Sequence, residues 1–295
     1  MMKLRRPFFV SVEPAAVCQL HCPACPVGMR KGPMANGQWL MAKEVWQRTL
    51  SEAAKTAYVM QFYFQGEPLL HKDLPQMIAE AHAAGLYTIV STNAQALTPE
   101  MAEALVQSGL NRIIVSMDGL TEESYNAYRV GGSLEKTKAA LRYLREAKIN
   151  NPKSKILIEL QCLRLKTNEH EWEAFKRQYK TLGADRLTFK TAQLYDYADG
   201  HPLMPSNPRY SRYTKGPDGR YHRKPRVPWC MRVWSGVVIT TTGEVLPCCY
   251  DKAHAHAYGN IMESPLTELI HNDKARAFFH AAQKELPDIC KECWR

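Results

Sequence analysis

The chain has 295 residues, of which 45% are hydrophobic, and a formal net charge of +10. This composition supports a sizeable core in one large domain or two modest ones and argues against disorder. No apolar run reaches the length of a membrane span or a secretory signal, which predicts a cytoplasmic protein with no membrane partner. The positive charge indicates a basic solvent-facing surface or an anionic ligand. No recognised motif accompanies it that would favour nucleic acid.

Strand-like and helix-like segments alternate through the first two thirds of the chain. Short β-branched or aromatic runs predict strands, and capped amphipathic runs that stop at glycine predict helices. The strands are expected at 8–12, 58–64, 87–92, 112–116, 156–163 and 186–190, and the helices at 74–84, 98–108, 121–128, 134–148 and 170–182. Such alternation predicts a parallel sheet covered by helices, either a barrel or an open wound sheet. Its active site is expected at the carboxyl ends of the strands.

The composition changes at residues 194–228, which are rich in Pro, Gly, Tyr and basic residues. Between positions 205 and 228, seven Lys or Arg residues stand against a single acid, Asp218. Long loops of this kind are uncommon unless they are functional. The segment is therefore interpreted as a solvated basic linker or a substrate loop, and its interleaved tyrosines favour a substrate or interface role.

The remaining residues, 229–295, predict a small α+β domain. Two short strand-like runs at 236–240 and 244–247 flank Gly243, which is typical of a hairpin. Two short helices are expected after it, at 266–270 and 273–283.

Nine cysteines are many for a cytoplasmic chain, where disulfides do not persist, so metal or redox roles are favoured. They fall into an N-terminal group and a C-terminal group, with one more between them that is expected in the core. The N-terminal group is Cys18, Cys22 and Cys25, the C-terminal group is Cys230, Cys248, Cys249, Cys290 and Cys293, and the one between is Cys162. Two separate groups suggest two metal sites.

The N-terminal cysteines have the spacing C-x3-C-x2-C and come directly after the first expected strand. Thiolates are the standard ligands of iron–sulfur clusters, and three of them leave one iron of a four-iron cube open to an outside ligand. The alternative is a structural zinc ion that takes a fourth ligand such as His21. The position at the expected catalytic edge of the sheet favours the cluster.

This spacing after the first strand of a β/α array resembles the radical S-adenosylmethionine (SAM) superfamily. The resemblance implies a partial (β/α)6 TIM-like barrel over residues 1–193, with a 4Fe–4S cluster that binds SAM at its open iron. It also implies that an electron, from a flavodoxin or ferredoxin type donor, cleaves SAM to a 5′-deoxyadenosyl radical that abstracts hydrogen from the substrate.

Four further segments resemble the superfamily in chain order, most of them at an expected strand end. The resemblance implies that they bind SAM through Gly66, Glu67, Ser91, Asn93, Ser116, Asp118 and Arg129. Glycine lets the backbone approach a ligand, and a carboxylate complements an ammonium group. Two positions depart from the pattern. Ala24 replaces the usual aromatic residue before the third cysteine, and Gln65 replaces the first glycine of the Gly-Gly-Glu-Pro segment.

The C-terminal cysteines resemble the SPASM/Twitch extension of radical SAM enzymes, which holds auxiliary 4Fe–4S clusters. The resemblance implies one such cluster bound by Cys230, Cys248, Cys290 and Cys293. Four thiolates would equally suit a structural zinc ion. Cys248 and Cys249 are adjacent and are not both expected to bind one cluster. Gly-x4-Cys spacing favours Cys248, which leaves Cys249 as a buried residue or as a thiol for hydrogen-atom donation.

These features predict a radical SAM oxidoreductase acting on a small substrate, sugar-like or phosphorylated, by dehydrogenation or epimerisation. Seventeen residues precede Cys18, which leaves no room there for a leader-binding domain and favours a small molecule or a peptide presented by another protein. The alternative is a peptide or protein maturase of the SPASM group, and a remote one is a zinc-binding, nucleic-acid-associated protein. Lys190, Arg164 and His201 are candidates for a general base near strand ends.

Overall fold

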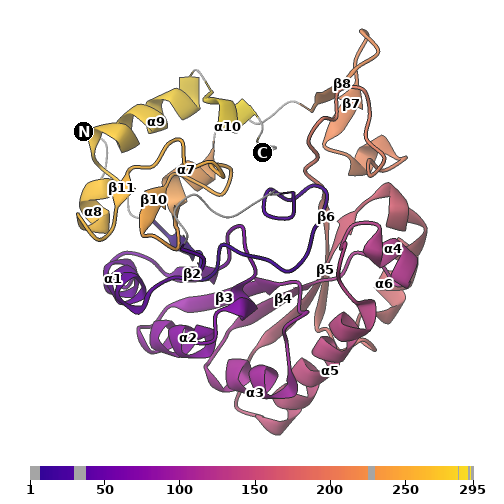
Figure 1. Ribbon diagram of the computed structural model, residues 1–295, viewed down its shortest axis with the longest axis horizontal. Helices are drawn as coiled ribbons and strands as arrows, with labels where there is room; N and C mark the ends of the chain where they lie inside the picture. The colour runs from indigo at the N-terminus through magenta and orange to yellow at the C-terminus, as the bar shows by residue number, and fades with distance from the viewer. Residues whose placement is uncertain (1–6, 30–37, 225–229, 285, 292, 294–295) are drawn as a thin grey trace.

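A computed structural model describes residues 7–29, 38–224, 230–284, 286–291 and 293 of the chain. Within these residues, nine strands form one sheet in the order β11-β10-β9-β1-β2-β3-β4-β5-β6 (Figure 1). Strands β1 to β6 pair in parallel, and β9 pairs in parallel with β1, whereas β10 and β11 are antiparallel additions. The parallel α/β architecture expected from the alternation of elements is confirmed.

The sheet contains β1 Phe9–Val12, β2 Val59–Phe62, β3 Tyr87–Thr92, β4 Arg112–Ser116, β5 Leu157–Arg164, β6 Arg186–Thr191, β9 Gly236–Ile239, β10 Glu244–Leu246 and β11 Gly259–Asn260. The α-helices are α1 Lys43–Ala53, α2 Leu74–Ala83, α3 Pro99–Gln107, α4 Glu122–Asn126, α5 Leu134–Asn150, α6 Trp172–Gln178, α7 Met231–Ser235, α8 Leu266–Leu269, α9 Asp273–Lys284 and α10 Asp288–Lys291. The 3-10 helices are η1 Pro68–Leu70, η2 Lys166–Glu171 and η3 Pro208–Tyr210, and a separate hairpin pairs β7 Tyr213–Lys215 with β8 Tyr221–Arg223.

Helix α1 is the longest element that the sequence patterns missed. Its buried positions Val45, Trp46, Thr49 and Ala53 have helical spacing, so the signal was present in the sequence. Helix α3 was anticipated correctly at its start, where the Thr98 hydroxyl accepts a hydrogen bond from the Met101 amide at 3.2 Å.

We call the face of the sheet that is covered by helices the outer face. The main hydrophobic core lies between this face and the helices. Helices α1, α2, α3 and α5 lie side by side against it in Figure 1, from indigo to magenta. Alternate strand residues such as Val10, Phe62 and Ile113 point into this layer and have no solvent exposure. Strand side chains alternate between faces, so the residues between them belong to the opposite, inner face.

The inner face is polar and only partly covered. Its side chains include Gln61 on β2, Ser91 on β3, Gln161 on β5 and Thr188 on β6, all of which keep some solvent exposure. The strand register places Gln161 between Ser116 and Thr188. This contrast between a dry outer face and an accessible inner face indicates that ligands enter on the inner side.

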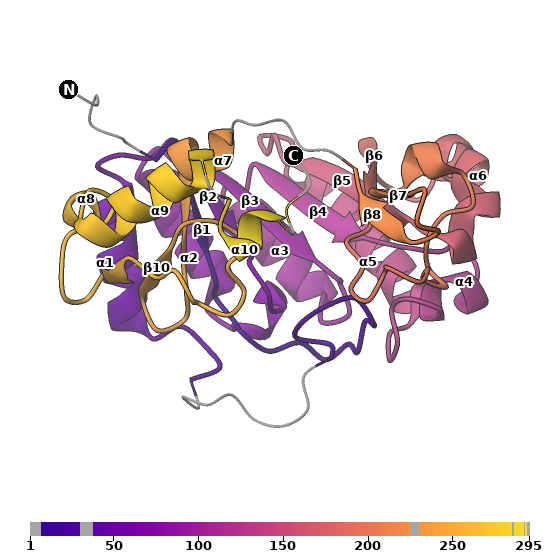
Figure 2. The same cartoon turned by 90° about the horizontal axis from the view of Figure 1, so that it is seen from above.

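The C-terminal segment extends the same sheet, because β9 pairs with β1 in continuous register from Phe9↔Gly236 to Val12↔Ile239. Helices α8, α9 and α10 lie on the far side of this extension from α2 and α3 (Figure 1), and Figure 2 shows the same elements from above. Gly243 in the β9–β10 turn has φ of +87°, a conformation that favours glycine.

The structure describes the basic segment after β6 as far as residue 224. Tyr213 is buried at its centre, where the ring stacks on Tyr197 at 4.2 Å and the hydroxyl bonds the backbone of Leu194. Residues 225–228 of the segment lie outside the described residues. No helix within the described part of the chain is both long and apolar enough to cross a membrane.

Candidate active site

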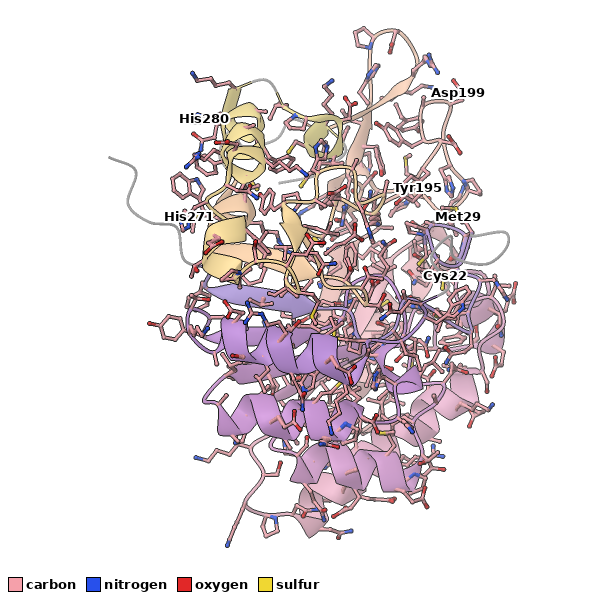
Figure 3. All side chains as sticks on the ribbon, turned by 60° about the vertical axis from the view of Figure 1, so that its left-hand side comes forward. Cys22, Met29, Tyr195, Asp199, His271 and His280 are labelled. Carbon is pink, nitrogen blue, oxygen red and sulfur yellow. The ribbon has the colours of Figure 1, made fainter. Side chains whose placement is uncertain are left out.

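The N-terminal cysteines lie on the loop after β1, above the carboxyl ends of the strands. This loop is the indigo segment near the top of β5 and β6 in Figure 1, and Figure 3 labels Cys22 and Met29 on it. Two N–H groups point at the first thiol. The amide of Leu20 donates to Cys18 Sγ at 3.4 Å, and the side chain of Asn93 donates to it at 3.3 Å. The rest of the loop forms a turn, in which the Cys25 amide donates a hydrogen bond to the Cys22 carbonyl at 3.1 Å.

Backbone contacts tie this loop to the segment after β2. The Glu67 amide donates to the Val17 carbonyl at 2.8 Å. A Cβ at Gly66 would stand 2.0 Å from the Ala15 carbonyl oxygen, a distance that no side chain tolerates. Gly66 is therefore required for close packing of two loops, a role that the sequence did not reveal. The glycine indirectly positions the cysteine loop over the sheet.

The Glu67 carboxylate lies beneath the loop, 3% exposed, with three donors around it. It accepts hydrogen bonds from the Thr92 hydroxyl at 2.6 Å, the Asn93 amide at 2.8 Å and the Leu69 amide at 3.0 Å. Burial raises its pKa, and these donors oppose the shift. The carboxylate thus fixes the end of β3, including the Asn93 side chain that reaches Cys18.

Asp118 and Arg129 form a buried ion pair at the end of β4. The Arg129 Nε donates to Asp118 Oδ2 at 2.6 Å, and the other Asp118 oxygen accepts the Leu163 amide at 2.6 Å. Although burial disfavours its charge, the neighbouring Asp118 carboxylate raises the pKa of Arg129, so the guanidinium stays charged. Its remaining N–H groups have no partner among the described residues, which leaves them available to an anion.

Ser91 and Ser116 are placed on the inner face by strand alternation, as their positions near the ends of β3 and β4 predict. Neither hydroxyl bonds another described residue. The structure therefore brings all seven expected SAM-binding residues to the carboxyl end of β2, β3 and β4 or to the loops beside it. Ala24, the departure from the family pattern, is buried against Tyr128 and Leu20 in a small apolar cluster under the cysteine loop.

The environment of these cysteines suits a metal cluster. Burial raises the pKa of the Cys22 thiol to about 11, with Arg129 opposing the shift. A thiol with that pKa is protonated at neutral pH unless coordination to a metal stabilises the thiolate. Arg129 and the N–H groups aimed at Cys18 complement a thiolate-bound, anionic cluster. Among the described residues, no three His, Cys, Asp or Glu side chains are grouped around a single ion position.

The C-terminal cysteines come from three separate segments. Burial raises the pKa of Cys248, and the nearby thiols Cys249, Cys290 and Cys293 raise it further. The Tyr250 amide donates to Cys248 Sγ at 3.4 Å, which repeats the N–H···S contact of the first loop. Cys230 is the N-cap residue of helix α7 and packs against the main core. The fold thus brings Cys248 near Cys290 and Cys293, which lie 42 and 45 positions further along the chain.

Cys249 lines the same small pocket beside β1 and β9 as Cys248, but its thiol also contacts Arg232. Arg232 donates to its Sγ at 3.2 Å, and both residues lie against Ser11 and Phe9, which belong to the inner face. Cys162, in contrast, is fully buried in β5 on the outer face, as expected for a core residue.

Hydrogen bonds link the barrel, the basic segment and the C-terminal segment. Arg212 donates to the Thr191 carbonyl at 2.8 Å and to the Tyr250 hydroxyl at 2.9 Å. Gln65, the second departure from the family pattern, donates to the Lys252 carbonyl at 3.0 Å. Lys252 in turn donates from Nζ to the Tyr195 hydroxyl at 3.1 Å. Only the replaced glycine at position 65 hinted at such a role.

The three candidates for a general base lie in different places. Arg164 is on the outer face, with its guanidinium 4.2 Å from the Tyr210 ring and 4.9 Å from the Phe189 ring, and this position away from the inner face does not fit a base. His201 Nδ1 accepts the Leu203 amide at 3.1 Å within the basic segment. Lys190 lies on the inner face of β6, opposite Leu163.

Two family models match the chain. The model of the radical SAM superfamily matches residues 12–175, and that of an iron-sulfur cluster-binding domain, SPASM, matches residues 230–294. The chain belongs to the radical SAM superfamily and is a radical SAM enzyme. Its cofactors are SAM and a 4Fe–4S cluster, together with auxiliary iron–sulfur binding in the SPASM region.

The chain is similar in sequence to proteins named PqqA peptide cyclase. It is 25% identical to the one from Rhizobium meliloti, covering 94% of this chain and 77% of that protein. It is 29% identical to the one from Rhodopseudomonas palustris, covering 82% of this chain and 67% of that protein.

Solved structures share the fold at lower identity. Streptococcus suis SuiB bound to S-adenosylmethionine has a TM-score of 0.72 at 14% identity, covering 98% of this chain and 72% of that one. The structure of anSMEcpe with bound AdoMet has a TM-score of 0.71 at 19% identity, covering 97% and 83%. BtrN in complex with AdoMet and 2-DOIA has a TM-score of 0.59 at 19% identity, covering 99% and 94%.

Proposed function

We propose that this enzyme is a SPASM-group peptide maturase that oxidises a peptide substrate. The sequence similarity to PqqA peptide cyclases over most of both chains carries this proposal. SuiB has also been solved bound to its precursor peptide, SuiA, and shares this fold with a TM-score of 0.68. The small, sugar-like substrate favoured by the sequence patterns has less support, although the BtrN structure, with 2-DOIA bound, matches nearly the full length of both chains.

In this proposal, the cysteines at positions 18, 22 and 25 hold the SAM-binding cluster. When bound, cluster and SAM supply a 5′-deoxyadenosyl radical, which removes a hydrogen atom from the substrate. The Leu20 amide and the Asn93 side chain stabilise the Cys18 thiolate by N–H···S contacts. Glu67 acts beneath them as a positioning residue, because its carboxylate orients the backbone from which Asn93 projects.

Arg129 is proposed to bind the SAM carboxylate through the N–H groups that Asp118 leaves free. Asp118 holds the guanidinium in place and prevents it from swinging toward solvent. The Ser91 and Ser116 hydroxyls supply hydrogen bonds from the inner face. Burial of this cluster of charges excludes water, which would otherwise compete for the same donors.

We divide the chain into a barrel of residues 1–193, a substrate segment of residues 194–228 and an auxiliary-cluster domain of residues 229–295. In that last domain, the proposed ligands of the auxiliary cluster are Cys230, Cys248, Cys290 and Cys293. Cys248 is favoured over Cys249 because Cys290 and Cys293 lie near it. Such a cluster supplies an electron acceptor, which an oxidation of the substrate by two electrons requires. A flavodoxin or ferredoxin type protein is the proposed donor of the initiating electron.

The proposal is tested with reduced, anaerobically reconstituted enzyme, SAM and short peptides encoded beside its gene. We expect one of these peptides to raise the yield of 5′-deoxyadenosine above the substrate-free background. Mass spectrometry should show that the same peptide has lost two hydrogens. If sugar derivatives raise the yield and no peptide does, the enzyme acts on a small molecule and this proposal is wrong.

A further inference from the structure

Arg232 on α7 lies beside two segments that carry proposed ligands of the auxiliary cluster. It follows Cys230, the N-cap residue of this helix, by two positions. Its Nη1 atom donates a hydrogen bond to Cys249 Sγ at 3.2 Å, and Cys249 is joined directly to Cys248. Arg232, Cys248 and Cys249 also line one small pocket beside β1 and β9. The guanidinium group is therefore fixed next to these cysteines by a side-chain contact as well as by the course of the chain.

The positive charge of Arg232 is not neutralised by a carboxylate within the described ranges. The other contact of its side chain is with the Phe9 ring, whose centroid lies 5.8 Å from the guanidinium carbon. At the first cysteine group, by contrast, Arg129 pairs with Asp118 at 2.6 Å. Arg232 is also only partly exposed, so salt and water screen its charge less than they screen that of a surface arginine. Its charge therefore acts on the groups beside it, among them the cysteine sulfurs.

A cation and an N–H···S contact both favour the reduced form of an iron–sulfur cluster. Reduction adds one negative charge to the cluster, and a nearby cation stabilises the more negative form more strongly. Hydrogen bonds to the cysteine sulfurs act in the same direction. The Tyr250 amide supplies one such bond, to Cys248 Sγ at 3.4 Å, whereas Arg232 supplies a bond to Cys249 together with a full charge. Both effects raise the reduction potential.

We propose that Arg232 raises the reduction potential of the auxiliary cluster and so makes that cluster a better electron acceptor. In the proposed oxidation, the 5′-deoxyadenosyl radical removes one hydrogen atom from the substrate. The substrate radical then loses one electron to the auxiliary cluster and one proton to solvent, which accounts for both hydrogens. Either Cys248 or Cys249 as the ligand leaves Arg232 beside it, because the guanidinium contacts one of them and shares a pocket with both. This inference rests on the auxiliary cluster of the proposed function and not on the identity of the substrate.

The potential is measured on reconstituted enzyme with SAM bound, by a redox titration followed with electron paramagnetic resonance. The signal of the SAM-binding cluster changes when SAM is added, so the signal that does not change reports the auxiliary cluster. We expect Arg232→Gln to lower the midpoint potential of that signal by at least about 59 mV, which is a tenfold change in a one-electron equilibrium. Arg232→Lys keeps the charge and should change the same equilibrium by less than about threefold.

The matched control is Arg276→Gln, which removes the same charge from an exposed position on α9, where Arg276 pairs with Asp273 at 2.6 Å. Its midpoint potential should equal that of the unsubstituted enzyme, and all three variants should keep about eight irons per chain. An unchanged midpoint in Arg232→Gln would overturn the inference, as would an equal shift in Arg232→Lys or Arg276→Gln. Loss of iron from Arg232→Gln would also overturn it, because the side chain would then be needed to assemble the cluster.

The substrate of the proposed function is tested separately. Failure of every peptide to raise 5′-deoxyadenosine would disprove the peptide substrate and leave these potentials standing. Only about four irons in the unsubstituted enzyme would instead refute the auxiliary cluster, and the role of Arg232 with it.

Discussion

The two cysteine groups of this chain are built in opposite ways. The N-terminal group lies on one loop, where eight consecutive residues contain all three thiols and a single turn relates two of them. The C-terminal group is assembled from segments up to 63 positions apart, brought together by a strand that joins the main sheet and by helices packed behind it. The first site depends on local sequence, and the second depends on the whole fold.

This contrast implies that the two sites can fail independently. A change in the first loop should remove one cluster and leave the fold intact. A change at the junction of barrel and C-terminal segment should leave SAM cleavage in place and disturb only the later oxidation of the substrate. Four sets of variants test this difference.

Cys22→Ser should have the greatest consequence. Loss of a thiolate from a three-thiolate site should abolish assembly of the SAM-binding cluster, so 5′-deoxyadenosine should fall to background, a loss of at least about a thousandfold. Iron content should fall from about eight to about four per chain. Cys162→Ser, in the core, is the control and should retain all iron. Retention of SAM cleavage by Cys22→Ser would show that the ligands were assigned wrongly.

Cys248→Ala and Cys249→Ala form the second pair. If Cys248 binds the auxiliary cluster, its removal should cost about four irons per chain, whereas Cys249→Ala should keep about eight. SAM cleavage should persist in both variants, but peptide product per 5′-deoxyadenosine should fall sharply only in Cys248→Ala. The reverse pattern of iron loss would make Cys249 the ligand.

Arg212→Gln should loosen the junction itself. The side chain joins Thr191 at the end of β6 to Tyr250, whose amide contacts Cys248. Its loss should lower the free energy of unfolding by about 1.5–3 kcal/mol, as for other hydrogen bonds to charged groups. Arg209→Gln, an exposed neighbour, serves as the control in the same thermal melts. A stable Arg212→Gln variant with unchanged product yield would mean that the junction is held elsewhere.

Gln65→Ala should be the mildest of these changes. It removes one neutral hydrogen bond, to the Lys252 carbonyl, so the expected loss of stability is about 0.5–1.5 kcal/mol. Product yield per 5′-deoxyadenosine should fall modestly while SAM cleavage is unchanged. A fall in SAM cleavage itself would indicate that Gln65 acts on the first site and not on the junction.

Local patterns in the amino-acid sequence were enough to place strands β1 to β6 and to indicate the first site. Short β-branched and aromatic runs located strands β1 to β6 within two residues of their observed bounds, and the cysteine spacing together with polar strand ends carried the resemblance to radical SAM enzymes. These features are local, so neighbouring residues carry enough information to reveal them. Helix α1 also had a local signal, and it was overlooked.

The remaining features became visible only in the folded chain. The extension of the main sheet by β9, the approach of Cys290 and Cys293 to Cys248, the packing role of Gly66 and the aromatic surroundings of Arg164 all depend on residues that are distant in sequence. Strand pairing and side-chain burial arise from contacts across the chain, and residue spacing does not encode them.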